Sequence, residues 1–153
     1  MEHKGLTVLE ILFAISILTL AVTIVAFSFS KLNSKQALDR SADLVVSILD
    51  DARSLTLSSK GGSQYGVQFE ASQVILFKGV AYSSSDSSNV VTELNPMVGL
   101  RNVVLSGGGV SVVFERLTGN TNHAGSVEVF LKAVPETLRT ISISATGVSN
   151  VIF

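Results

Sequence analysis

Residues 6–30 read LTVLEILFAISILTLAVTIVAFSFS, and Glu10 is the only charged side chain among them. The part from Ile11 to Ser30 carries no charge at all. A helix of about 20 apolar residues is long enough to cross the hydrocarbon core of a bilayer. A carboxylate within such a segment is energetically costly, so it is expected to have a specific role. The run therefore predicts a membrane-spanning helix in which Glu10 has a function of its own.

Two common interpretations of this segment fit it poorly. A cleaved secretory signal has an apolar region of about 7–15 residues and a small-x-small cleavage site. This run is longer, and Ala26-Phe27-Ser28 is a poor match to such a site. A plain signal anchor accounts for the length of the run but leaves Glu10 without a role.

The N-terminus resembles that of type IV prepilins and pseudopilins. In that family a short polar leader ends in glycine, the mature chain starts with an apolar residue, and its fifth residue is glutamate. Gly5, Leu6 and Glu10 occupy these positions here. The resemblance implies that a membrane-embedded aspartic prepilin peptidase cleaves between Gly5 and Leu6 and N-methylates Leu6.

The same resemblance implies a partner for Glu10 and an orientation for the chain. In the family this glutamate pairs with the N-terminus of a neighbouring pilin or pseudopilin subunit, and a paired charge costs much less in low dielectric than an unpaired one. The leader with Lys4 stays on the cytoplasmic side of the cytoplasmic membrane, in agreement with the positive-inside rule. The C-terminal domain lies outside the cytoplasm. Thr7 could supply a nearby hydroxyl partner, but we favour its interpretation as an ordinary helical residue.

Beyond Ser30 the sequence becomes amphipathic with helical spacing. No proline or glycine occurs between Leu6 and Lys60, and Gly61-Gly62 end the pattern. A continuous helix of that extent would be about 80 Å long. The apolar stripe consists of Leu38, Ala42, Val45, Leu49, Ala52 and Leu55. The charged residues predicted to face solvent are Lys35, Asp39, Arg40, Asp43, Asp50, Asp51 and Arg53.

From Tyr65 onward the apolar period changes to two, which is typical of strands. Residues 65–70 and 73–78 predict a hairpin across Ala71-Ser72. The further strands are expected at Val90–Leu94, Arg101–Leu105, Val110–Arg116, Val127–Lys132, Arg139–Ser144 and Val148–Phe153. These strands predict one antiparallel sheet or two small ones covered by the amphipathic helix, an α+β fold. The expected organisation is a leader (1–5), a transmembrane half-helix (6–30), an amphipathic half-helix (31–60) and a β-rich domain (61–153).

Three segments of this domain give a narrower resemblance, to minor pseudopilins of the GspH/FimT type. They are Tyr65–Phe69, Phe114–Thr121 and Arg139–Gly147. That group has a phenylalanine-to-glycine loop midway and a strand and turn of the form Arg-x-Ile/Val-x-Ile/Val-Ser-x-x-Gly near the end. We expect Gly119 and Gly147 to provide turn geometry and Arg139 to start an exposed strand.

Composition removes several classes of chemistry. The chain has 153 residues, no cysteine and two histidines, which excludes disulfides and thiolate metal sites. His3 would leave with the leader, and His123 is expected to be solvated in a polar loop. Serine, histidine and aspartate do not form a recognisable nucleophile arrangement. We therefore expect no enzyme, no catalytic residue, no cofactor and no metal.

Charge gives little reason to expect a nucleic-acid partner. The formal net charge is −1, which exerts no general attraction on polyanions. After Lys60 the basic residues are Lys78, Arg101, Arg116, Lys132 and Arg139. The acidic residues there are Glu70, Asp86, Glu93, Glu115, Glu128 and Glu136. Folding could still gather arginines on one face.

The sequence therefore favours a structural minor pilin or pseudopilin subunit of a type IV pilus or type II secretion-type filament. The first alternative is an adhesive or DNA-binding minor pilin of a DNA-uptake pilus. The second is a membrane-anchored β domain that never assembles.

Overall fold

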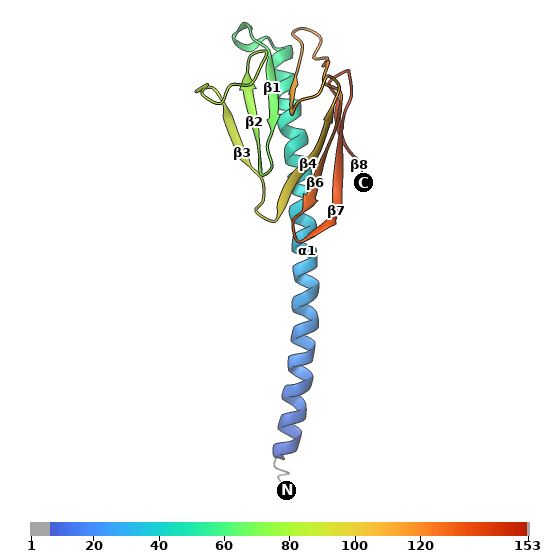
Figure 1. Ribbon diagram of the computed structural model, residues 1–153. Helices are drawn as coiled ribbons and strands as arrows, with labels where there is room; N and C mark the ends of the chain where they lie inside the picture. Colours follow the sequence, from blue (N-terminus) through green and yellow to red (C-terminus); the bar gives the residue numbers. More distant parts are fainter. Residues whose placement is uncertain (1–6, 153) are drawn as a thin grey trace. The chain divides into compact units, whose positions relative to one another are not determined.

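The computed structural model describes residues 7–152, apart from the side chains of residues 27 and 29–31. The chain divides into two compact units, Met1–Lys35 and Gln36–Phe153, and each unit is described by itself. Figure 1 shows the helix and the strands.

The first element is helix α1, Val8–Leu57. It contains neither proline nor glycine, the two residues that most strongly disfavour a helix interior. Its end agrees with the end predicted from the pattern. Ser59 adopts the left-handed conformation with φ 49°, and the short 3₁₀ helix η1, Lys60–Gly62, follows. Gly61 and Gly62 have φ values of 62° and 67°, which glycine tolerates and other residues disfavour.

Within residues 7–152, eight strands form two separate four-stranded sheets, and Figure 1 shows their arrangement. The first sheet has the order β3-β2-β1-β5, with β1 at Tyr65–Phe69, β2 at Gln73–Lys78, β3 at Val90–Glu93 and β5 at Ser111–Val113. The second has the order β4-β6-β7-β8, with β4 at Val98–Leu105, β6 at Gly125–Leu131, β7 at Val134–Ile143 and β8 at Ser149–Ile152. All neighbouring strands are antiparallel. The α+β prediction is confirmed.

Strand positions agree better with the sequence pattern than strand lengths do. The β1–β2 hairpin forms as predicted, with Phe69 opposite Val74. Strand β5 is shorter than predicted, because the chain turns at Phe114 into the loop that precedes β6. Strand β7 begins earlier than predicted, because a tight turn pairs Leu131 directly with Val134.

The second half of α1 and both sheets share one hydrophobic core. The helix contributes Leu38, Ala42, Val45, Leu49 and Ala52 of the predicted stripe, all at most 1% exposed, whereas Leu55 is only partly buried. The first sheet supplies buried valines and Phe69 to the same core, and the second sheet supplies buried valines, leucines and isoleucines. Apolar burial of this kind is the main favourable term in folding. The helix thus joins the two sheets, which do not share a strand.

A buried threonine connects the end of α1 to the first strand. The Thr56 hydroxyl donates to the Ala52 carbonyl at 2.8 Å and accepts the backbone N–H of Tyr65 at 3.0 Å. A buried hydroxyl must find partners of this kind, because an unsatisfied one is costly. Thr56 therefore sets where β1 starts relative to the last turn of the helix.

Two predictions about charged residues, Asp39 on the helix and Arg139 on β7, are wrong. Asp39 does not simply face solvent, because its carboxylate lies 2.8 Å from Nη2 of Arg139. Arg139 does not start an exposed strand either: it lies in the middle of β7, and its side chain is only 15% exposed. Because both residues were assigned to separate solvated surfaces, sequence reasoning missed that the fold places them opposite each other.

Candidate functional site

The first turn of α1 contains the residue predicted to act in assembly. The Thr7 side-chain oxygen accepts the backbone N–H of Glu10 at 3.2 Å, and the Thr7 carbonyl accepts the N–H of Ile11 at 3.2 Å. Thr7 is therefore the N-cap of the helix, and Glu10 is its third residue. This arrangement corrects the interpretation of Thr7 as an ordinary helical residue. The Thr-x-x-Glu spacing is the signature of a capping box and could have revealed the cap.

Glu10 lies on an exposed, otherwise apolar surface. Its neighbours Val8, Leu9 and Ile11 are 77%, 66% and 46% exposed. A carboxylate in the first turn also interacts favourably with the positive end of the helix dipole. The side chain is thus available to a partner outside its own unit.

The segment Val8–Ala26 is long and apolar enough to cross a membrane, with a mean hydropathy of 2.6. Its hydroxyl groups bond to the helix itself. Ser16, Thr19 and Thr23 donate to the carbonyls of Leu12, Ser16 and Thr19 at 2.7, 2.9 and 2.7 Å. These polar side chains therefore do not need partners from outside the helix.

The other two predicted site residues, Gly5 and Leu6, lie outside the described residues. The processing site between them stays a prediction. The described part of the site begins with the cap at Thr7, the second residue after the expected cleavage position.

A second cluster, at the last turns of α1, joins the helix to two loops. The Arg53 side chain donates from Nε to the carbonyl of Gly119 at 3.2 Å. Gly119 and Gly147 are both buried and have φ values of 65° and 77°. A Cβ atom on Gly147 would meet the carbonyl oxygen of Gly119 and lie 3.0 Å from Arg53 Nε. The predicted turn role of these glycines therefore has a second reason, the close approach of two loops around Arg53.

Arg53 was also predicted to face solvent, and this prediction is wrong. Its side chain is half-buried and donates a hydrogen bond to the loop at Gly119. Helical spacing could not have identified it. The position lies beside the apolar stripe, and its partner is a backbone carbonyl 66 residues away in sequence.

Replacing Gly147 with alanine should destabilise the folded domain by at least about 2 kcal/mol, since both the left-handed conformation and the clash with a backbone carbonyl are unfavourable. Gly62→Ala is the matched control, because Gly62 has a similar φ of 67° but open space around its Cβ position. It should cost about 1 kcal/mol. Urea denaturation of a fragment spanning residues 31–153 measures both. Equal losses would mean that the loop contact contributes nothing.

The cations of the β-rich unit are mostly engaged by protein groups. Arg101 forms a 2.9 Å ion pair with Glu128, and its guanidinium lies 4.7 Å from the centre of the Phe130 ring. Lys132 donates to the Pro96 carbonyl at 3.0 Å, and Arg139 pairs with Asp39. A carboxylate or a backbone carbonyl of the protein thus holds each of these three cations.

A metal site would need several histidine or acidic side chains close together. Within residues 7–152, no group of three or more histidine, aspartate or glutamate side chains is placed to hold a metal ion. Asp86 accepts hydrogen bonds from the backbone N–H and the hydroxyl of Ser88, which lower its pKa. His123 was expected to be solvated, but it is half-buried and its Nδ1 atom is covered.

Solved structures share this fold. The type IV minor pilin FimU of Pseudomonas aeruginosa matches in two crystal forms. The first has a TM-score of 0.58 and 15% identity over 76% of this chain and 93% of FimU. The second has a TM-score of 0.60 and 14% identity over 80% and 92%. The minor pseudopilin EpsH from the type 2 secretion system of Vibrio cholerae has a TM-score of 0.56 and 15% identity over 75% of this chain and 95% of EpsH.

At the level of sequence, no family model and no curated protein matches the chain. The structural likeness defines a fold class: a type IV pilin-like protein with a long N-terminal apolar helix and antiparallel sheets packed on its second half.

Proposed function

We propose that this chain is a minor pilin or pseudopilin subunit that is built into a filament through its N-terminal helix. The observation that carries the proposal is Glu10, a lone carboxylate in the capped first turn of an exposed apolar helix. The pilin-like fold of the rest of the chain supports it, since FimU and EpsH are a minor pilin and a minor pseudopilin.

In this proposal the chain is first a membrane protein. The Val8–Ala26 segment spans the cytoplasmic membrane once, with Lys4 on the cytoplasmic side and the β-rich unit outside. Prepilin peptidase removes residues 1–5 and methylates the new N-terminus at Leu6. The mature chain then begins at Leu6, one residue before the helix cap at Thr7.

Assembly then follows from the charge at Glu10. In an apolar filament core an unpaired carboxylate is expensive, whereas one paired with an amino group costs far less. The new amino terminus of a neighbouring subunit is the proposed partner. Such a pair would set the stagger between adjacent helices, because it forms at one relative position of the two chains. The protein would act as a structural subunit and carry out no catalysis itself.

The arginines of the β-rich unit support the DNA-binding alternative less well than they support a structural role. Of the basic residues in the β-rich unit, Arg101 and Arg139 are paired with Glu128 and Asp39. Their positive charge is neutralised within the protein, so it would release few counterions on binding DNA.

Replacing Gly5 with valine should block processing, because a β-branched side chain crowds the backbone at the cut site and removes the flexibility of glycine. Co-expression of the wild-type chain with a prepilin peptidase should yield a product that lacks residues 1–5 and carries a methyl group on Leu6. Gly5→Val should accumulate as the full-length precursor. Intact-mass analysis distinguishes the two species.

His3→Ala is the matched control, since it changes the leader without touching the bond to be cut. It should be processed like the wild type. Cleavage at another position, or normal cleavage of Gly5→Val, would refute the proposed processing.

A further inference from the structure

Strand β8 leaves one edge of the second sheet open. It is the last strand in the order β4-β6-β7-β8, so β7 is its only strand neighbour within residues 7–152. The ladder between the two strands starts where Ser144 donates its backbone N–H to the Val148 carbonyl at 2.9 Å. Bonded pairs recur at every second residue of an antiparallel ladder. Asn150 therefore directs its backbone groups to β7, and Ser149 and Val151 direct theirs to the open edge.

This open edge can accept another strand. β8 contains no charged residue and no proline, and its pairing with β7 has no register shift. Charged residues, proline and bulges are features that commonly block pairing at an edge. The backbone groups of Ser149 and Val151 are thus able to bind an added extended segment, the recognition mode called β-augmentation.

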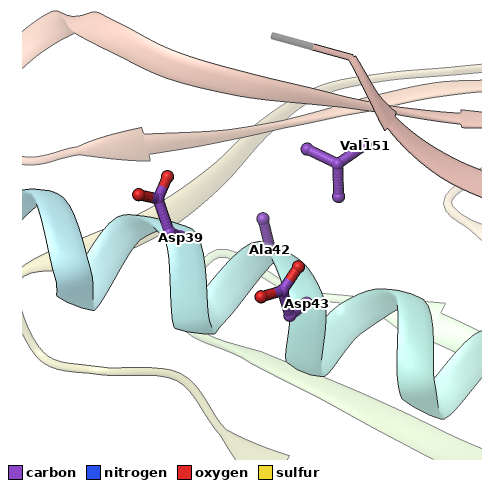
Figure 2. A pocket seen from close by; sticks show the side chains of 4 residues that line it. All are labelled: Asp39, Ala42, Asp43 and Val151. Atoms are coloured by element: carbon purple, nitrogen blue, oxygen red, sulfur yellow. The ribbon is translucent and has the colours of Figure 1, made fainter.

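A hollow lies beside the open edge, between α1 and β8 (Figure 2). Its volume is about 180 Å³, and it is lined by Asp39, Ala42, Asp43 and Val151. Arg139 neutralises Asp39 at a distance of 2.8 Å. Asp43 is exposed, and none of the described residues places a cation within ion-pair distance of it. A free negative charge therefore lies next to the apolar surface of Ala42 and Val151.

Val151 belongs to both the edge and the hollow. Its side chain lines the hollow, and its backbone groups face the open edge. Side chains that lie directly opposite each other on paired strands are on the same face of the sheet. A residue paired with Val151 would therefore place its side chain at the hollow. Lysine or arginine suits this position, because its aliphatic stem packs on apolar surface while its charged end stays in water beside a carboxylate.

A second copy of this chain does not offer such a strand. The strands at the sheet edges of the described chain are β3, β5, β4 and β8. Among these four, only β4 contains a cationic residue, Arg101. Its guanidinium is already held by Glu128 at 2.9 Å and by the Pro135 carbonyl at 3.1 Å. The added strand is therefore expected to come from a different protein.

We propose that an extended segment of a different filament subunit adds to β8 as a further strand and places a lysine or arginine side chain in the hollow beside Asp43. This inference deepens the proposed function, on which it rests, by naming the chemistry of one contact between this subunit and a neighbour. Backbone hydrogen bonds to Ser149 and Val151 supply affinity, and the hollow selects the side chain.

Peptide binding to the full chain in detergent tests the charge selection. The probes are the end-blocked peptide Thr-Val-Thr-Lys-Thr-Val-Thr and the same peptide with glutamate in place of lysine. The lysine peptide should bind at least about tenfold more tightly. Asp43→Lys should reverse this preference. Asp51→Lys is the matched control and should keep it, because Asp51 is equally an exposed acid of α1 but does not line the hollow.

Val151→Pro tests the backbone part of the site. Proline lacks the N–H that faces the open edge, whereas the bonds from β8 to β7 come from the residues on either side. The variant should unfold thermally close to the wild type, and its affinity for the lysine peptide should fall at least about tenfold. Asn150→Ala changes a side chain on the other face of β8 and should bind like the wild type.

Methylated peptides give the same test without changing the protein. In the lysine peptide, the N–H groups of lysine and valine would face β8, and those of threonine would face away. N-methylation of the lysine and the valines should therefore abolish binding, whereas N-methylation of the threonines should leave most of it. This comparison decides the backbone contact if Val151→Pro does not fold.

Photo-cross-linking identifies the segment that occupies the edge. Ile152, which is 55% exposed on β8, is replaced by benzoylphenylalanine in cells that contain the assembly machinery and its other subunits. Mass spectrometry should find an adduct with a different filament subunit, linked within a segment that contains lysine or arginine. The same replacement at Val80, which is 76% exposed and lies outside β8, is the matched control and should not give this adduct.

Several results would overturn the inference. They are absence of binding by the lysine peptide, equal binding of the lysine and glutamate peptides, equal binding of the two methylated peptides, or an adduct with a second copy or with a protein outside the filament. Incorporation of the wild-type chain into filaments is measured in the same cells. Its absence would defeat the proposed function, whereas the peptide measurements would still decide what the edge and the hollow bind.

Discussion

Replacing Glu10 with alanine should leave the chain in the membrane but lower its incorporation into filaments at least about tenfold, the effect of losing about 1.4 kcal/mol of pairing energy. The carboxylate lies on an exposed apolar surface, where a partner from another subunit can reach it. Removing it deletes the proposed pair with the amino terminus of a neighbour. Quantifying the variant in sheared filaments against its level in membranes measures the effect.

Glu10→Gln separates the two roles that the structure offers this residue. Glutamine at the third helical position can still form a capping box with Thr7, but it cannot form an ion pair. If pairing is the function, Glu10→Gln should be as defective as Glu10→Ala. Recovery of incorporation in Glu10→Gln would instead assign the effect to the helix cap.

Ile17→Leu is the neutral control within the span and should assemble normally, because it preserves the apolar character of the surface. Leader cleavage is checked in every sample, since a processing defect would imitate an assembly defect. A plain membrane anchor makes the opposite prediction: without Glu10 the segment would insert at least as well, and nothing else would change.

The second large effect is expected in the core of the β-rich unit. Leu49→Asp should destabilise this unit by at least about 4 kcal/mol, because it combines the loss of a buried leucine with the burial of an unpaired charge. Leu49 is fully buried on the helix face shared by both sheets. A loss of that size is a large part of the stability of a small domain, so the variant should be mostly unfolded.

Asp50→Ala is the neighbouring control. Asp50 is exposed and accepts one hydrogen bond, from the Ser149 hydroxyl at 3.3 Å, so its removal should cost less than about 1 kcal/mol. Urea denaturation followed by circular dichroism, on a fragment spanning residues 31–153, gives both values. Similar midpoints for the two variants would show that the helix stripe does not form the core.

The helix and the strands could be predicted from the sequence, because each depends on the spacing of apolar residues close together in the chain. The stripe from Leu38 to Ala52 and the hairpin across Ala71-Ser72 are both found where the pattern places them. Apolar residues at every third or fourth position lie on one face of a helix, and apolar residues at every second position lie on one face of a strand. That face is the one that the fold buries. The α+β fold follows from combining these two periods.

The features that depend on distant partners could not be predicted. Arg139 and Asp39 are ordinary surface residues by their local context, and only the packing of β7 near the helix places them 2.8 Å apart. Leu117, in the loop between β5 and β6, has a left-handed backbone conformation with a φ of 70°. The hydrogen bonds of this loop, rather than the preference of leucine, account for that conformation. The candidate assembly site is an intermediate case: Glu10 is conspicuous in the sequence, whereas the cap at Thr7 was overlooked although its spacing is local.

If the apolar helix moves from a bilayer into a filament, as proposed, its hydroxyl groups affect the cost of that transfer. Ser16, Thr19 and Thr23 already donate to carbonyls of their own helix, so neither lipid nor a neighbouring helix has to supply an acceptor. Moving the segment from bilayer to filament therefore breaks no hydrogen bond made by these hydroxyls. The activation barrier to that transfer should come from desolvating and pairing the carboxylate at Glu10.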